Sequence, residues 1–141
     1  MQTTWVKDYE ISIQEAPDYH WYSYDSKNYD KVFHLTSAED FTRTILLTIK
    51  RAHQEKKVVL VVPYYTIVDH CALPAGNRLF LMLNDLLCLF NLESLDIDKQ
   101  QKLDTIGTMF ASYPYKQDFI LYGELDIFRV TSNLSIQWQF S

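Results

Sequence analysis

The stretch that decides the fold is RLFLMLNDLLCLF, residues 78–90. Apolar side chains occupy nearly every position, so their spacing alone does not separate a helix from a strand. Leucine and methionine without any valine or isoleucine favour a buried helix, which we expect over residues 78–91. A hairpin that turns at Asn84-Asp85 is the alternative.

Two further helices are predicted on either side of this stretch. Thr36 and Glu39 have the spacing of a capping box, which would start a helix over residues 37–54. Apolar residues recur behind it at helical spacing: Phe41, Ile45, Ile49 and Ala52. Asp98 stands where an N-cap would begin a third helix, over residues 98–112. Its helically spaced residues are Leu103, Ile106, Gly107 and Phe110.

Strand signals occupy the middle and both ends of the chain. Residues 58–62 form a continuous run rich in valine, typical of a strand buried on both faces. Residues 5–13 mostly alternate in polarity, and residues 119–130 are also strand-rich. In residues 134–140 apolar side chains alternate strictly with Ser and Gln, which predicts a half-buried antiparallel strand with one wet face. Together the patterns predict an α+β fold: one domain, residues 1–141, with a mainly antiparallel sheet, a central buried strand over residues 58–62 and about three helices.

Composition and charge limit the classes of function. The chain has 141 residues and is 48% hydrophobic, which is enough for one domain with a real core. Its net charge of −5 is uneven, because residues 79–141 carry −4 and residues 1–78 carry −1. This excess of acid disfavours general nucleic-acid binding and favours a basic partner. We see neither a signal peptide nor an apolar run of the roughly 20 residues that a membrane span needs, so we expect a cytoplasmic protein.

Few residues have the pattern of a reaction centre. Three glycines leave no room for a phosphate-binding loop, and the spacing of His and Cys does not suit zinc. We therefore expect no cofactor and no metal. The tripeptide Asp69-His70-Cys71 is the one place where an acid, an imidazole and a thiol meet. A small hydrolase or nuclease that uses His70 with Asp69 or Cys71 is accordingly an alternative function.

The segment 18–30 is the candidate recognition surface. It holds five aromatic residues and three aspartates with Ser and Asn between them. Tyrosine and tryptophan offer a large contact area at low entropic cost, and they carry a polar group as well. The predicted partner-binding residues are Asp18, Tyr19, His20, Trp21, Tyr22, Tyr24 and Asp25.

These features favour a protein-binding module over an enzyme. The most concrete version is an immunity protein or antitoxin of bacteria, which would neutralise a toxin, such as a basic nuclease, by covering its active site. We expect a monomer or a weak dimer. A structural or phage-accessory oligomer is a further alternative, because the strand over residues 134–140 could pair with another chain if it lies at a sheet edge.

Overall fold

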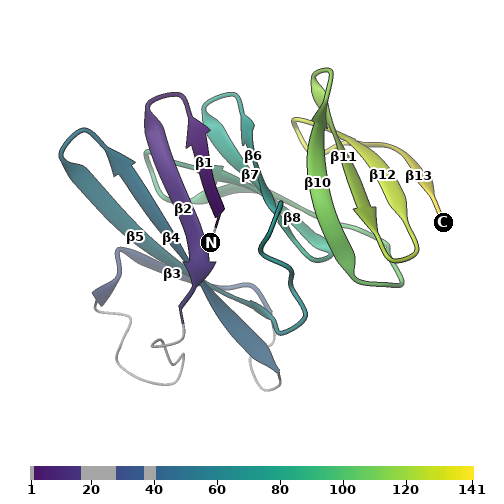
Figure 1. The fold of residues 1–141 in the computed structure, drawn as a ribbon, viewed down its shortest axis with the longest axis horizontal. Helices are drawn as coiled ribbons and strands as arrows, with labels where there is room; N and C mark the ends of the chain where they lie inside the picture. The colour runs from purple at the N-terminus through teal and green to yellow at the C-terminus, as the bar shows by residue number, and fades with distance from the viewer. Residues whose placement is uncertain (1, 17–27, 37–40) are drawn as a thin grey trace. The chain divides into compact units, whose positions relative to one another are not determined.

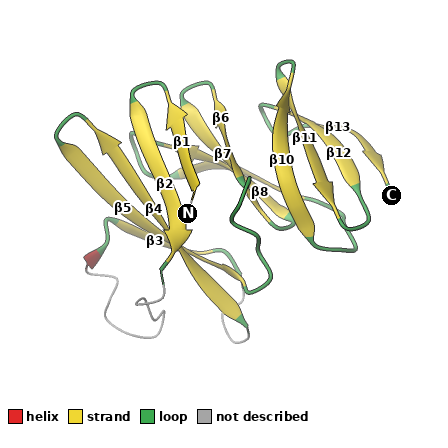
Figure 2. Ribbon diagram, in the orientation of Figure 1, coloured by secondary structure: helices red, strands yellow, loops and turns green. Residues whose placement is uncertain are grey.

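The computed structural model describes residues 2–16, 28–36 and 41–141 of the chain. These residues form thirteen β-strands and no α-helix, and the short segment drawn red before β3 in Figure 2 is a 3₁₀ turn (Figures 1 and 2). Strands make up 65% of the structure. The predicted α+β class with about three helices is therefore wrong, and the described part of the chain is nearly all β.

The chain divides into two compact units, Met1–Thr66 and Ile67–Ser141. We call them the N-terminal and the C-terminal unit and describe each by itself. That residues 1–141 form one domain stays a prediction.

The N-terminal unit is built on a five-stranded sheet with the order β1-β2-β4-β5-β3. The strands are β1 (Gln2–Val6), β2 (Tyr9–Glu15), β3 (Lys31–His34), β4 (Thr42–Arg51) and β5 (Gln54–Pro63). Neighbours pair antiparallel, except that β3 pairs with β5 in parallel. Residues 58–62 lie in β5 with their side chains fully buried, so the strand that their valine-rich run predicted is confirmed.

The predicted helix over residues 37–54 is wrong. Of its described residues, 42–51 form the strand β4. Ile45, Leu47 and Ile49 are buried in alternation with half-buried neighbours, the period of two that a strand requires. Ile45 and Ile49 misled the prediction because a spacing of four fits a helical turn and is also a multiple of two. Glu39, the second residue of the predicted capping box, lies outside the described residues.

The C-terminal unit consists of two four-stranded antiparallel sheets. The first contains β6 (Ala72–Ala75), β7 (Arg78–Leu83), β8 (Leu86–Asn91) and β9 (Ile97–Lys102), and the second contains β10 (Met109–Tyr115), β11 (Asp118–Gly123), β12 (Ile127–Thr131) and β13 (Ile136–Phe140). Both sheets contribute to one buried core, in which the Phe80 and Phe119 rings lie 4.6 Å apart between centroids. Burial of such rings is the main favourable term in folding.

The predicted helix over residues 78–91 is wrong, and the hairpin alternative is confirmed. Leu83 pairs with Leu86 across the turn at Asn84-Asp85, and Asn84 has a φ of 57°. Residues 79–83 are buried on both faces of β7. A strand buried on both faces has no polar side to mark its period, which is why its composition resembled that of a buried helix.

The predicted helix over residues 98–112 is also wrong. Its residues form most of β9, a loop, and the first half of β10. The helical spacing predicts that Leu103 and Ile106 share one buried face. In the structure Leu103 is buried, whereas Ile106 is 85% exposed. Gly107 lies in the loop, where an added Cβ would come within 2.9 Å of Glu124 Cβ.

Two-residue turns join five of the strand pairs. In each, the first turn residue has a positive φ: Lys7, Ala52, Gly76, Asn84 and Lys116. Glycine and asparagine tolerate this left-handed region, but alanine and lysine do so at a cost. Three of the five turns therefore lack the residues that mark a hairpin in a sequence.

Candidate binding face of the C-terminal unit

The partner-binding residues predicted from the sequence lie outside the described residues. They are Asp18, Tyr19, His20, Trp21, Tyr22, Tyr24 and Asp25. Their role as a recognition surface stays a prediction.

A different group of aromatic residues lies exposed on one face of the sheet β10-β11-β12-β13, whose strands are drawn in Figure 1. Strand pairing sets Tyr113, Ile120, Arg129 and Trp138 in one row across the four strands. The next row holds Tyr122, Ile127 and Phe140. Side chains directly opposite one another on neighbouring strands share a face and interact. We call this the aromatic face; it comprises Phe110, Tyr113, Tyr115, Ile120, Tyr122, Ile127, Arg129, Trp138 and Phe140.

The rings of the aromatic face contact one another. Tyr113 and Tyr122 are stacked, with centroids 5.9 Å apart and planes 8° apart. Phe110 meets Tyr122 edge to face at 6.3 Å, and Trp138 lies 5.2 Å from Phe140. A hydrogen bond with Tyr122 is the main cause that raises the pKa of Tyr113 above its ordinary value. These contacts hold the rings in a fixed arrangement while 37–68% of each ring residue stays exposed.

An ion pair fixes one side of the aromatic face. Arg129 Nε donates to Asp118 Oδ2 at 2.9 Å. The Arg129 guanidinium also lies 5.0 Å from the centre of the Tyr115 ring, within the range of a cation–π contact. Lys116 Nζ lies 5.5 Å from the same ring. Arg129, the one charged residue of the aromatic face, is thus paired with Asp118, and the other residues of the face are uncharged.

Sequence reasoning identified the alternation in β13 but placed its burial wrongly. The predicted buried side chains Trp138 and Phe140 are 38% and 68% exposed. Gln139 is exposed, as expected, and donates from Nε2 to the carbonyl oxygen of Asp104 at 2.8 Å. Alternation gives the period of a strand and does not say which face is covered. The signal that could have located the site is the repeated Tyr in Tyr113-Pro114-Tyr115, which adds rings at alternate positions.

In the tripeptide Asp69-His70-Cys71, the thiol is not placed as an accessible nucleophile. Asp69 and His70 are exposed, whereas Cys71 is fully buried. Burial raises the pKa of the Cys71 thiol to about 12. A nucleophilic cysteine needs a stabilised thiolate and access to substrate. The His70 ring instead lies 5.7 Å from Tyr113, at the border of the aromatic face.

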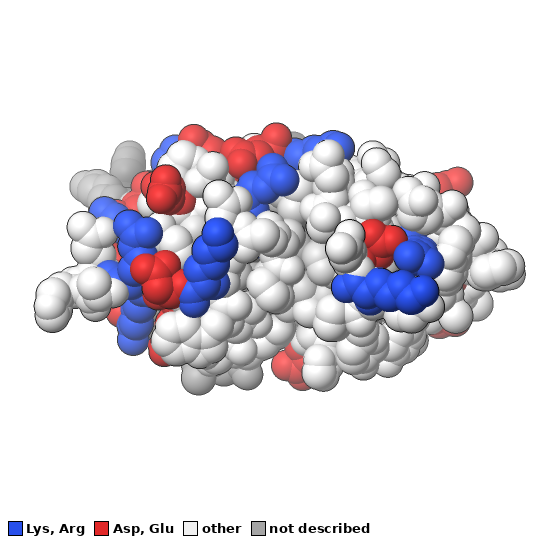
Figure 3. All heavy atoms as spheres, turned by 90° about the horizontal axis from the view of Figure 1, so that it is seen from above, with Lys and Arg blue, Asp and Glu red and all other residues white. Residues whose placement is uncertain are grey.

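A shallow depression lies on the sheet of the N-terminal unit. Its volume is about 460 Å³, and polar side chains from β1, β2, β4 and β5 line it, among them Glu10, Lys50, Glu55 and Lys57. Lys50 and Glu55 form an ion pair at 3.7 Å. Figure 3 shows basic and acidic side chains next to one another, without a patch of one sign on the face displayed. Such mixed charge does not provide the basic footprint of a nucleic-acid site.

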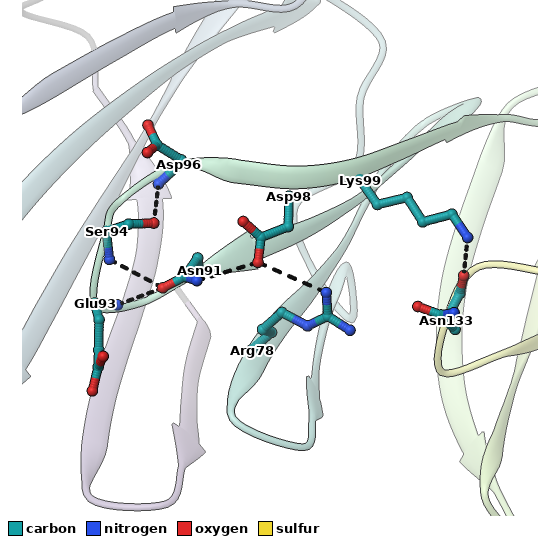
Figure 4. A network of polar contacts seen from close by, with 8 residues as sticks. All are labelled: Arg78, Asn91, Glu93, Ser94, Asp96, Asp98, Lys99 and Asn133. Carbon is teal, nitrogen blue, oxygen red and sulfur yellow. Dashed lines mark hydrogen bonds and ion pairs between the residues drawn. The ribbon is translucent and has the colours of Figure 1, made fainter.

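A polar network surrounds the loop between β8 and β9 (Figure 4). Asn91 Oδ1 accepts hydrogen bonds from the backbone amides of Glu93 and Ser94, each at 3.0 Å. Asn91 Nδ2 donates to Asp98 Oδ2 at 3.2 Å, and Arg78 forms an ion pair with the same carboxylate. These bonds fix the loop, so we assign the network a structural role. Within residues 2–16, 28–36 and 41–141, no group of three potential ligands is placed to hold a metal ion.

No helix in the described part of the chain has both the length and the apolar character to cross a membrane. Comparison with protein families, with curated proteins and with solved structures finds no match for this chain.

Proposed function

We propose that this protein is a binding module that recognises another protein chain through the aromatic face. The observation that carries the proposal is the set of exposed and mutually contacting rings on β10, β11 and β13. Soluble proteins rarely leave a contiguous apolar patch of this kind open unless it binds something.

The residue types of the aromatic face favour a protein as the ligand. Tyr, Trp and Arg are the residues that most often dominate the binding energy of protein interfaces. The strands hold these rings in place before binding, which reduces the entropy lost on association. Nucleic acid is a poorer candidate, because the C-terminal unit carries nine acidic and five basic residues.

An immunity protein or antitoxin remains the most concrete form of the proposal. In this form the protein acts in the cytoplasm, and the acidic surface attracts a basic toxin domain. The segment Asp18 to Asp25 would add to the contact. A hydrolase that uses Cys71 is a weaker candidate, given the burial of its thiol.

The test compares two matched double variants. Tyr113→Ser/Tyr122→Ser removes the stacked pair of the aromatic face, and Tyr64→Ser/Tyr65→Ser removes two exposed tyrosines of the N-terminal unit. A partner is first identified by affinity capture and then purified, and its Kd is measured by titration calorimetry. Because central aromatic residues of an interface each contribute about 2 kcal/mol or more, we expect the first variant to weaken binding about 30-fold or more.

The control variant should bind with the wild-type Kd. Thermal melts followed by circular dichroism establish that both variants are folded. Equal Kd values for the wild type and the folded Tyr113→Ser/Tyr122→Ser variant would contradict the proposed function.

A further inference from the structure

We propose that the chain forms a dimer in which the aromatic faces of two copies cover each other. This inference rests on the proposed function, because it names the partner at the same site. It follows from the area, the charge and the rigidity of the face.

The aromatic face is large enough to hold two copies together. Its six rings, on Phe110, Tyr113, Tyr115, Tyr122, Trp138 and Phe140, are between 37% and 68% exposed. With roughly 150–250 Å² for each aromatic side chain, they present roughly 500 Å² per copy. Two faces would then remove roughly 1,000 Å² from water before Ile120 and Ile127 are counted, which reaches the lower bound for a specific interface.

The charge of the aromatic face favours an identical face as its partner. Asp118 and Arg129 neutralise each other at 2.9 Å. Lys116 and Glu124, in the turns at the two ends of β11, carry one charge of each sign and add no net charge. The other residues of the C-terminal unit include seven acids and three bases, a charge of −4. The acidic residues of two copies repel each other. This repulsion is weakest when the copies meet through their neutral aromatic faces.

This arrangement leaves the acidic surface available. In the dimer the aromatic face supplies the contact between the two copies, and the acidic remainder of the C-terminal unit attracts a basic partner. A dimer through the aromatic face and a basic partner elsewhere are thus compatible.

Sedimentation velocity of the purified full chain tests the dimer without any other component. We expect the wild type to pass from monomer to dimer with a Kd on the order of 10 µM, as for other small interfaces. Tyr122→Ser/Trp138→Ser should raise this Kd at least about 10-fold, because it removes rings from both rows. Ile127→Lys should do the same by placing a charge in the apolar contact. The control Tyr64→Ser/Tyr65→Ser should dimerise as the wild type does.

The dependence of dimerisation on salt concentration provides an independent test. Apolar association persists in 1 M NaCl, whereas association through opposite charges weakens as the salt screens them. If the double variant does not fold by circular dichroism, Ile127→Lys and the salt series still decide the question.

A wild type that stays monomeric up to about 200 µM, well above the Kd expected for an interface of this size, overturns the dimer. Unchanged dimerisation of folded Ile127→Lys does so as well. A monomeric wild type whose affinity for another partner depends on Tyr113 and Tyr122 would leave the proposed function intact. A dimer that resists both face variants would overturn the further inference, and the capture experiment would still decide the proposed function separately.

Discussion

At Asp126, hydrogen bonds from several parts of the C-terminal unit converge on one buried carboxylate. The donors are Ser141 Oγ, Thr105 Oγ1, Gln139 Nε2 and the backbone amide of Ile106. The bonds from Ser141 and Thr105 are the main causes that lower the pKa of Asp126 to about 2, from its ordinary value of 3.8. The ionised form of Asp126 therefore stabilises the folded state.

The lowered pKa predicts how stability depends on pH. Because the folded pKa lies below the unfolded one, the contribution of Asp126 is complete above about pH 4 and is lost as the pH falls towards 2. Asp126→Asn should lower the melting temperature at pH 7. It should also flatten the loss of stability between pH 4 and pH 2.5, measured by thermal melts. A variant that keeps the wild-type pH profile would contradict this role.

The two cysteines provide a second prediction at the residue scale. Cys71 and Cys88 are fully buried, and burial raises the pKa of each thiol to about 12. Ellman's reagent at pH 8 should therefore leave both thiols of the native protein unmodified, since it needs an accessible thiolate. In denaturant both should react. Rapid modification of one thiol in the folded protein would show that it is accessible.

Single residues also show what a sequence can and cannot predict. Residues 58–62 were predicted correctly, because a short β-branched run buried on both faces has few alternatives. Trp138 and Phe140 were not, because their large apolar side chains suggested burial. All five residues of β13 are exposed, and alternation alone does not tell whether the apolar side of a strand is covered.

At the scale of the elements, the hairpin turns predict opposite changes in stability for substitutions at Ala52 and Gly76. Ala52 has a φ of 54° and Gly76 has a φ of 67°. Left-handed backbone costs alanine roughly 1 kcal/mol more than glycine. Ala52→Gly should therefore raise the free energy of unfolding by about 0.5–1 kcal/mol, and Gly76→Ala should lower it by about 1 kcal/mol.

The pair is well matched, because a Cβ added at Gly76 meets nothing within 4 Å. Any loss at Gly76 then comes from the backbone and not from a clash. Denaturant unfolding of the two variants measures both changes. A change of the same sign in both would contradict the assignment to backbone conformation.

The same turns explain why the elements were predicted poorly. The turn at Ala52-His53 contains no glycine, proline or asparagine, so the strands on either side of it were not recognised as a hairpin. The turn at Asn84-Asp85 does carry such a signal, and there the hairpin was recognised as an alternative. Turn chemistry is thus the information that separates a hairpin from a helix where the hydrophobic pattern fits both.

At the scale of the whole molecule, the aromatic face depends on three successive strand pairings that bring residues from four strands together. The rings of Phe110 and Phe140 come from opposite edges of one sheet, 30 positions apart. Composition indicated a chain rich in tyrosine and tryptophan, which favoured recognition over chemistry. It could not place these rings on a common face, because that needs the order of the strands as well as their residues.

The parallel pairing of β3 with β5 has a consequence for the order of assembly during synthesis. β3 precedes its only partner in the sheet by the whole length of β4. A chain that emerges from the ribosome starting with residue 1 exposes Lys31–His34 before the strand that will accept it has been translated. The hairpin of β4 and β5 forms from neighbours and can close at once, whereas β3 must wait. β3 is therefore made early but can join this sheet only after β5 has been made.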